Sequence, residues 1–356
     1  MYPITKILKI KGLVVYLHRL IINSVLVTLF ILFSGISKAQ DLSFSQFYAS
    51  PLYLNPAFTG IHKANKLCLH YRNQYNPLKS YTSYAVSFDK YIDKLSSGIG
   101  IQLVKSDAAN SAFQNEAVSL SYAYANSFTK KLAFQGALQV GYQYEQLDAD
   151  KLIVYNQINP TNGQVLGPIT AYENITTSTK KGFADINAGF LVYNQNFYSG
   201  IAVKHLTQPA VGYVQASVLP VLINVHAGYQ FHNPSKLIEK SWYFTPTLLL
   251  AIQGNYKELN LGFYSGLKNI FWGISYRNTL SNADAMIFLM GIGVNNWRIG
   301  YSFDYNIATK YNVPRITHEL ALSYVFSKTK NGVSATEEWG NSKSSHRRMK
   351  CPKFFK

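Results

Sequence analysis

The stretch "KLAFQGALQVGYQYE", residues 131–145, decides the fold class because its side chains alternate between two kinds. Large apolar and aromatic residues take one parity: Phe134, Leu138, Val140, Tyr142 and Tyr144. Small and polar residues take the other parity: Gln135, Ala137, Gln139, Gly141 and Gln143. Successive side chains of a β-strand point to opposite faces, so this period of two predicts a strand that separates two different environments.

The same alternation recurs along the chain, for example in "EAVSLSYAY" (116–124), "WRIGYSFDYN" (297–306) and "HELALSYVF" (318–326). Segments such as "NSFTKK", "HNPSK" and "GLKN" separate these runs and have the composition of turns. About fourteen such runs can be counted if each strand is taken to be roughly ten residues long, which is the length of strands in outer-membrane barrels. The predicted strand cores are 65–73, 80–90, 97–105, 113–126, 131–145, 182–194, 196–206, 221–232, 241–253, 256–266, 270–278, 284–295, 297–306 and 316–327.

We therefore predict an all-β fold, a transmembrane outer-membrane β-barrel of about 14 antiparallel strands. The gaps between strands alternate in length, and the longest gap, 146–181, follows an odd-numbered strand. Barrels of this kind have short periplasmic turns and long outer loops, so both termini are expected to be periplasmic. The 27 tyrosines also fit a membrane interface. The alternative, a soluble β-sandwich or propeller, would place apolar side chains on the face that is polar here.

The N-terminus has the pattern of a secretory signal peptide. Residues 1–39 contain several lysines and no acidic residue, and a mostly apolar run from Ile21 to Ile36 leads to Ser37-Lys38-Ala39. Cleavage is expected near Ala39, with an uncleaved anchor as the alternative. The predicted organisation is a signal peptide (1–39), an N-terminal periplasmic or lumenal segment (40–64), a transmembrane barrel (65–327) and a basic periplasmic tail (328–356). The expected location is the bacterial cell outer membrane.

Nothing in the sequence indicates catalysis, a metal or a cofactor. The eight histidines are scattered without metal-ligand spacing, and no nucleophile-elbow or phosphate-loop motif occurs. We predict that the protein is not an enzyme. The two cysteines, Cys68 and Cys351, lie at opposite ends of the chain, so two free thiols are expected, with a disulfide between them as the alternative. The formal net charge of +17 is concentrated at the two ends and does not indicate nucleic-acid binding in an exported protein.

Charged residues on the polar parity of the strands are candidates for the barrel lumen: Arg72, Glu116, Asp185, Arg277, Arg298, Asp304 and Glu319. The first and last strands become neighbours when a barrel closes, so Arg72 and Glu319 are expected to be able to meet inside it. Two interpretations stay open. The charges form a salt-bridged, stable interior, or they line a pore that selects ions.

The segment that follows the signal peptide, "SQFYASPLYLNPAFTG" (45–60), resembles the start of the PorP/SprF family of Bacteroidota outer-membrane proteins. The residues that carry the resemblance are Gln46, Phe47, Pro51, Asn55, Pro56, Ala57 and Gly60. Further resemblances follow in order: "YRNQY" (71–75, with Tyr75 where the family usually has Trp), "SGIGIQLVKSDA", "FYSGIAVKHLTQP", "FWGISYRN", "WRIGYSFDYN", "THELALSYVF" and "CPKF" (351–354). Together they span about 40–356.

The resemblance implies a non-catalytic barrel that acts as an anchor or adaptor in type IX protein secretion, or in the export of surface adhesins and gliding motility. The implied partners are outer-membrane lipid and periplasmic type IX secretion components, a large secreted adhesin, or both, with the barrel monomeric inside a larger complex. The alternative function is an outer-membrane pore for small solutes. The sequence does not identify the secreted partner.

Two segments outside the strands are candidate contact sites. Residues 41–60, with Gln46, Phe47, Pro51, Asn55, Pro56 and Gly60, are predicted to form a plug or a partner motif, and a simple turn on the barrel rim is the alternative. The tail residues Cys351, Pro352 and Phe354 are a candidate contact for a periplasmic partner, and a solvated disordered tail is the alternative.

Overall fold

A computed structural model describes residues 41–76, 81–129, 132–153, 157–165, 167, 179–211, 217–233, 242–279, 283–307 and 316–326. The predicted signal peptide and the basic tail lie outside these residues. The strands are β1 (Asn65–Asn76), β2 (Tyr81–Ile92), β3 (Ser97–Ala108), β4 (Phe113–Ser127), β5 (Ala133–Leu147), β6 (Thr179–Tyr193), β7 (Phe197–Lys204), β8 (Leu222–Tyr229), β9 (Phe231–Asn233), β10 (Trp242–Gln253), β11 (Tyr256–Leu267), β12 (Ile270–Asn278), β13 (Ala283–Val294), β14 (Trp297–Asn306) and β15 (Ile316–Phe326). Short helical turns are α2 (Pro51–Leu54), η1 (Pro56–Phe58), η2 (Asp93–Leu95) and η3 (Ala149–Lys151).

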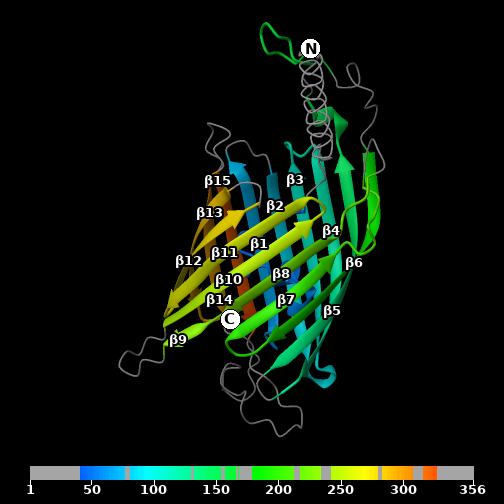
Figure 1. Cartoon of the computed structure of the whole chain (residues 1–356). Helices are drawn as coiled ribbons and strands as arrows, with labels where there is room; N and C mark the ends of the chain where they lie inside the picture. The colour runs from blue at the N-terminus through cyan, green and yellow to red at the C-terminus, as the bar shows by residue number, and fades with distance from the viewer. Residues whose placement is uncertain are drawn as a thin grey trace, which may run out of the picture. The chain divides into compact units, whose positions relative to one another are not determined.

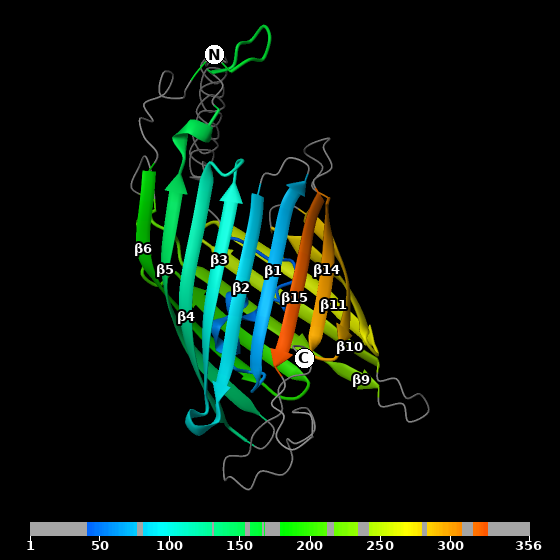
Figure 2. The ribbon, with the colours of Figure 1, turned by 180° about the vertical axis from the view of Figure 1, so that it is seen from behind.

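Every described strand pairs antiparallel with its neighbours, and the sheet closes on itself where β1 pairs with β15. Figures 1 and 2 show the strands as a tilted ring seen from its two sides. Closure pairs the first and last strands, so neither is left as a free edge of the sheet, and free edges are not tolerated in lipid. The predicted antiparallel barrel is therefore confirmed.

The barrel has fourteen strand positions, because β8 and β9 share one position beside β10. Gly228 pairs with Thr247 and Phe231 pairs with Phe244, so the register continues unchanged across the break. The break at Gln230 falls opposite Thr245, next to Pro246, which has no backbone N–H to give to the ladder. The predicted count of fourteen is confirmed.

The two faces of the barrel differ as the alternation predicts. Leu138, Val140 and Tyr142 on β5 are more than half exposed on the outside, whereas Gln135 and Gln139 are buried inside. Aromatic contacts gather at the barrel end where β5 and β14 begin and β15 ends, as in the pairs Trp297–Tyr324 and Phe128–Phe134. An aromatic girdle at the edge of an apolar outer surface is typical of membrane barrels.

The long strand connections lie at the opposite end, called the loop end here. The interval between β5 and β6 is the longest, and the strands β7 and β8 stop short at this end, with eight residues each against fifteen in β5 and β6. The barrel wall is therefore lower beside β7 and β8 than beside β5 and β6. Among the described residues, no helix has the length and apolar character needed to cross a membrane.

Candidate functional site

Residues 41–61, called the lumenal segment here, lie inside the ring of strands, where Figures 1 and 2 show them in dark blue. The segment is locally shaped by its own sequence. Pro51 and Pro56 each start a short helical turn, and the Asn55 side chain caps η1 by accepting a 2.8 Å hydrogen bond from the Ala57 amide. Gly60 then takes a positive φ of 73°, which glycine adopts without steric cost.

Asn55 also fixes the segment to the barrel wall. Its Nδ2 donates to Nε2 of His226 over 3.0 Å and to the backbone carbonyls of Phe190 and Ile201 over 3.2 Å. One side chain thus reaches β6, β7 and β8. The contact depends on Gly189, because a Cβ at that position would clash with the Asn55 amide oxygen.

Ser45 lies at the centre of a cluster of buried charges. Its hydroxyl donates to Asp304 over 2.5 Å and accepts from Arg72 at 2.8 Å and from Arg277 at 3.0 Å. The backbone amide of Ser45 donates to Glu319 over 2.7 Å. Buried charges are tolerated when they are paired and hydrogen-bonded. Here the lumenal segment supplies some of the hydrogen bonds that these charges need.

The charge cluster spans several strands of the wall. Arg72 and Glu319 face each other directly across the β1–β15 pair and form an ion pair, so they meet inside the barrel. Arg277 pairs with Asp304 at 3.2 Å and with Asp284 at 2.5 Å. Ser45 is therefore held by β1 and β15, the strands that close the barrel, together with β12 and β14.

A second hydrogen-bonded chain runs through Ser50, His70 and Glu319. The Ser50 hydroxyl lies 2.7 Å from Nδ1 of His70, and Nε2 of His70 lies 3.2 Å from the Glu319 carboxylate. Phe44 stacks on the His70 ring with a centroid separation of 4.2 Å. This series of hydrogen bonds connects the lumenal segment to β1 and β15. The Glu319 carboxylate also accepts a hydrogen bond from the backbone amide of Gln46 at 2.9 Å.

The start of the lumenal segment is held by a further ion pair. Nε2 of His205 lies 2.6 Å from Asp41, and Nδ1 lies 3.0 Å from Asp185. Burial alone would lower the pKa of His205, but the two carboxylates outweigh it and raise the pKa to about 9. Burial alone would raise the pKa of Asp41, but His205 outweighs it and the pKa falls below its ordinary value. His205 and Asp41 are therefore both charged at neutral pH.

Apolar side chains complete the contact between the lumenal segment and the wall. Phe58 is fully buried against Tyr198 and His226, and Phe47 packs edge-on to Tyr264. Hydrogen bonds of the segment reach β1, β2, β5, β6, β7, β8, β10, β11, β12, β14 and β15. The segment thus contacts the wall on all sides, which a turn resting on the rim would not do.

Most residues predicted for the site lie in this assembly. The motif residues Gln46, Phe47, Pro51, Asn55, Pro56 and Gly60 are all buried in the lumen. Arg72, Asp185, Arg277, Asp304 and Glu319 are buried and face it, and Arg298 lies 4.1 Å from the Phe271 ring centroid. The tail residues Cys351, Pro352 and Phe354 lie outside the described residues. Cys68 is a free, buried thiol.

Glu116 is a correction to the predicted set of lumenal charges. It shares the parity of Val118 and Leu120, which point outward, and its side chain is 53% exposed and paired with Lys105 at 2.6 Å. The pair lies on the outer surface near the loop end. The alternation of side chains along β4 itself predicts that Glu116 points outward, so Glu116 is not one of the charges that face the lumen.

Sequence reasoning missed several residues of the site, among them His70, Lys204, His226, Glu258 and Ser45. The first four have the parity of the polar face on their strands, so the same period of two could have found them. Ser45 lies outside the strands, where no periodicity applies. Among the described residues, no group of three His, Cys, Asp or Glu side chains is arranged to hold a metal ion.

The chain is similar in overall shape to several solved outer-membrane proteins at very low identity. The toluene transporter TodX of P. putida is 9% identical, with 77% of this chain and 93% of that chain covered and a TM-score of 0.45. Omp33 of Acinetobacter baumannii is 7% identical, with 75% and 100% covered and a TM-score of 0.42. A Pseudomonas aeruginosa FadL homologue is 11% identical, with 78% and 94% covered and a TM-score of 0.40. No curated protein sequence matches the chain.

A family model gives a more specific result than these structural likenesses. The model described as "Type IX secretion system membrane protein PorP/SprF" matches residues 36–324. The match includes the lumenal segment, all the strands up to β14 and most of β15. The closed antiparallel barrel and this match over most of the chain lead to one conclusion: the protein belongs to the PorP/SprF family of type IX secretion system membrane proteins.

Proposed function

We propose that this protein is a non-catalytic outer-membrane anchor or adaptor, acting in type IX protein secretion or in the export of a surface adhesin for gliding motility. The observation that carries the proposal is the filled lumen. The lumenal segment is hydrogen-bonded to strands around the whole barrel, and Phe47, Leu52 and Phe58 are almost fully buried in it. A barrel occupied in this way offers its surface, its loops and its ends to partners.

The alternative, a pore for small solutes, is less well supported by the same contacts. A solute would have to pass side chains that are held by buried charges, for example Ser45 between Arg72 and Arg277. Breaking such bonds leaves charges unpaired in a buried site, which costs several kcal/mol. Under the proposal, the ion pairs hold the lumenal segment as a plug.

The proposed partners are periplasmic components of the type IX system, a large secreted adhesin, or both. The basic tail, with Cys351, Pro352 and Phe354, stays the candidate contact for a periplasmic partner. Its excess of lysine and arginine suits an acidic surface.

Affinity purification from native outer membranes tests the proposal. The tagged full chain is extracted in mild detergent and compared with a chain truncated after Lys330, and co-purifying proteins are identified by mass spectrometry. We expect the full chain to recover type IX components or a large adhesin, and the truncated chain to recover less of a periplasmic partner. Recovery of the barrel alone, from membranes where the secretion machinery stays assembled, would contradict the adaptor role and favour the pore.

A further inference from the structure

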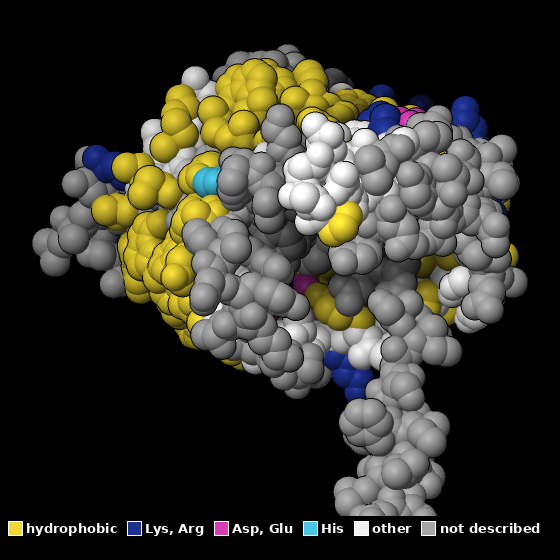
Figure 3. All heavy atoms as spheres, turned by 90° about the horizontal axis from the view of Figure 1, so that it is seen from above, with side chains coloured by type: hydrophobic (Ala, Val, Ile, Leu, Met, Phe, Trp, Pro, Cys, Tyr) yellow, Lys and Arg dark blue, Asp and Glu magenta, His cyan; other side chains and the backbone are white. Residues whose placement is uncertain are grey.

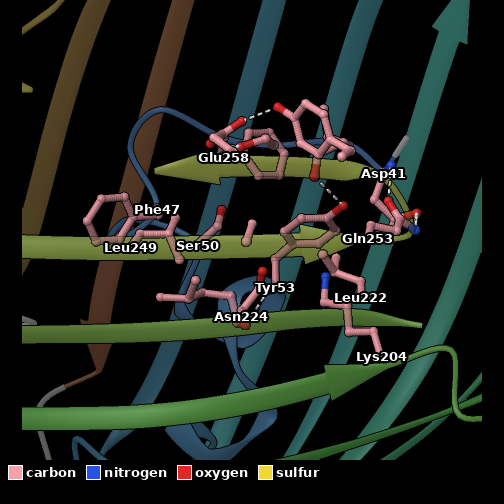
Figure 4. A pocket seen from close by; sticks show the side chains of 16 residues that line it. Asp41, Phe47, Ser50, Tyr53, Lys204, Leu222, Asn224, Leu249, Gln253 and Glu258 are labelled. Atoms are coloured by element: carbon pink, nitrogen blue, oxygen red, sulfur yellow. Dashed lines mark hydrogen bonds between the residues drawn. The ribbon is translucent and has the colours of Figure 1, made fainter. Parts of the chain in front are cut away.

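The first residue of the lumenal segment lies at the loop end of the barrel. The Asp41 amide donates a 2.9 Å hydrogen bond to Gln253, the last residue of β10. The Asp41 carboxylate lies 2.6 Å from His205, which directly follows the last residue of β7. Both strands run towards the loop end. Figure 4 shows Asp41 beside Gln253, with Phe47 and Leu249 further along the strands.

The last residues of the segment lie at the opposite end of the barrel. The Gly60 amide donates over 2.9 Å to Asp89, three residues before β2 ends. The Thr59 carbonyl accepts at 2.6 Å from Gln135, two residues after β5 begins. β1 then begins at Asn65. The segment therefore crosses the barrel from one end to the other and leads directly into the first strand.

The lumen behind Asp41 is filled by the segment itself. All residues from 44 to 61 except Ala49 and Tyr53 are buried, whereas residues 41–43 are partly exposed. Seen from the loop end, hydrophobic and acidic side chains are visible in a hollow near the centre of the molecule (Figure 3). A chain that continued from Asp41 towards the start of β1 would have to displace the buried side chains. The open direction from Asp41 is therefore outward, through the loop end.

Hydrogen bonds fix each of the first three residues of the segment in this position. The Leu42 carbonyl accepts from the Tyr53 hydroxyl at 2.7 Å, and the Ser43 hydroxyl donates over 3.1 Å to Glu258, the third residue of β11. These bonds add to the contacts of Asp41 with β10 and with the residue after β7. The start of the segment is thus held at the loop end and is not a loose end within the lumen.

The strand count locates the start of β1 and not the amino end of the chain. The turns at the end where β1 begins are short, which is typical of the periplasmic side of a membrane barrel. Residues 41–61 then carry the chain back across the barrel. Asp41 and Asn65 therefore lie towards opposite sides of the membrane.

We propose that the amino end of the mature chain lies at the loop end of the barrel, facing the cell exterior, and that the signal peptide is removed before the lumenal segment takes its place. Under this proposal the predicted periplasmic location holds for the start of β1 and not for the amino end. The inference does not depend on the adaptor role, because it rests on the path of residues 41–61.

The order of events follows from that path. A signal peptide that is still in the inner membrane holds the residues before Asp41 on the periplasmic side. For Asp41 to reach His205 and Gln253 at the loop end, a second length of chain would have to pass through the lumen that the segment fills. The segment therefore enters the barrel with its amino end free.

Epitope tags at three positions test the location of the amino end. The same short tag is placed between Gln40 and Asp41, after Asn162 in the β5–β6 connection at the loop end, and after Phe128 in the β4–β5 turn at the other end. Antibody binding is measured on intact cells and after the outer membrane is permeabilised, for barrels shown to be folded by heat-modifiable mobility. We expect the amino-terminal tag to behave like the Asn162 tag and to be reached on intact cells. An amino-terminal tag that behaves like the Phe128 tag, or that is reached in neither condition, overturns the proposal.

A signal peptide that is not removed tests the order of events. Ala39→Tyr puts a large side chain where the cleavage site needs a small one, and Lys38→Tyr is the matched control at the tolerant position between the small residues. We expect residues 41–61 to be open to protease in the uncleaved Ala39→Tyr chain and protected in the cleaved Lys38→Tyr chain. A folded, uncleaved Ala39→Tyr barrel with a protected segment overturns this part of the proposal.

A domain that folds in the periplasm, fused between Gln40 and Asp41, makes the same test in a chain whose signal peptide is removed. A folded domain cannot pass through the lumen, so we expect the segment of the folded fusion barrel to be open to protease. The same domain fused after Lys356 is the control and should leave the segment protected. A folded amino-terminal fusion with a periplasmic domain and a protected segment overturns the proposed path.

Discussion

The backbone amide of Ser45 donates a 2.7 Å hydrogen bond to the carboxylate of Glu319, 274 residues further along the chain. Glu319 lies on β15 and forms an ion pair with Arg72 on β1, where the barrel closes. Closure of the barrel and placement of the lumenal segment therefore use the same buried carboxylate. A change at this point should affect both.

Substitution Glu319→Gln should destabilise the barrel strongly. Among carboxylates, Arg72 would keep the more distant Asp304, at 3.5 Å, and the loss of one partner from a buried ion pair costs about 3–5 kcal/mol. Glu116→Gln is the matched control, because its pair with Lys105 is exposed on the outer surface and such pairs contribute less than about 1 kcal/mol. Urea unfolding in detergent, followed by heat-modifiable mobility, measures both. Equal midpoints for the two variants would contradict a structural role for the lumenal charges.

Substitution Asn55→Ala should loosen the lumenal segment. The change removes the cap of η1 and leaves His226 and two backbone carbonyls without their donor, at a cost of about 1–3 kcal/mol. Limited proteolysis between residues 41 and 61 should become faster. Asn162→Ala serves as the control, since this asparagine is exposed and, among the residues that the structure describes, is bonded to Gln164 in its own loop. If the lumenal segment is cleaved at the same rate in both variants, Asn55 does not anchor it.

The attachment of Asp41 should weaken at alkaline pH. The pKa of His205 is raised to about 9, so its contribution to stability is complete below the ordinary pKa of about 6.5 and is lost as pH rises through 9. The pKa of Asp41 is lowered, so its contribution is present above the ordinary value and is lost only in strong acid. Between these limits both charges hold the start of the segment.

A fluorescent label at Leu42→Cys, in a Cys351→Ser background, reports this release. We expect a change in emission centred near pH 9, because the start of the segment becomes exposed to water. The variant His205→Gln should not show that transition. A transition of the same size and midpoint in His205→Gln would assign it to other groups.

Much of the fold could be predicted from the sequence because a membrane barrel imposes opposite environments on alternate side chains. On β5, Leu138 and Val140 face outward and Gln135 and Gln139 face inward, as their parity indicates. The meeting of Arg72 and Glu319 follows from closure alone, since the first and last strands become neighbours. The misplaced Glu116 reflects an error in assigning parity and not an exception to the rule.

The position of the lumenal segment could not be predicted in the same way. The segment is irregular, and the sequence left a plug and a rim turn as alternatives. Its placement depends on contacts between distant residues, such as Asn55 with His226 and Ser45 with Arg277, which no local pattern encodes. The break between β8 and β9 is a similar case, because Pro246 belongs to the neighbouring strand β10 and not to the strand that is interrupted.

Single-channel conductance in a planar bilayer tests most directly whether the lumenal segment closes the barrel. The full chain, a chain lacking 41–60 and the double variant Ser45→Ala/Asn55→Ala are compared, each shown to be folded by heat-modifiable mobility. We predict little current through the full chain, a stable open conductance after the deletion, and intermittent openings in the double variant. A folded deletion variant that conducts no more than the full chain would contradict the account.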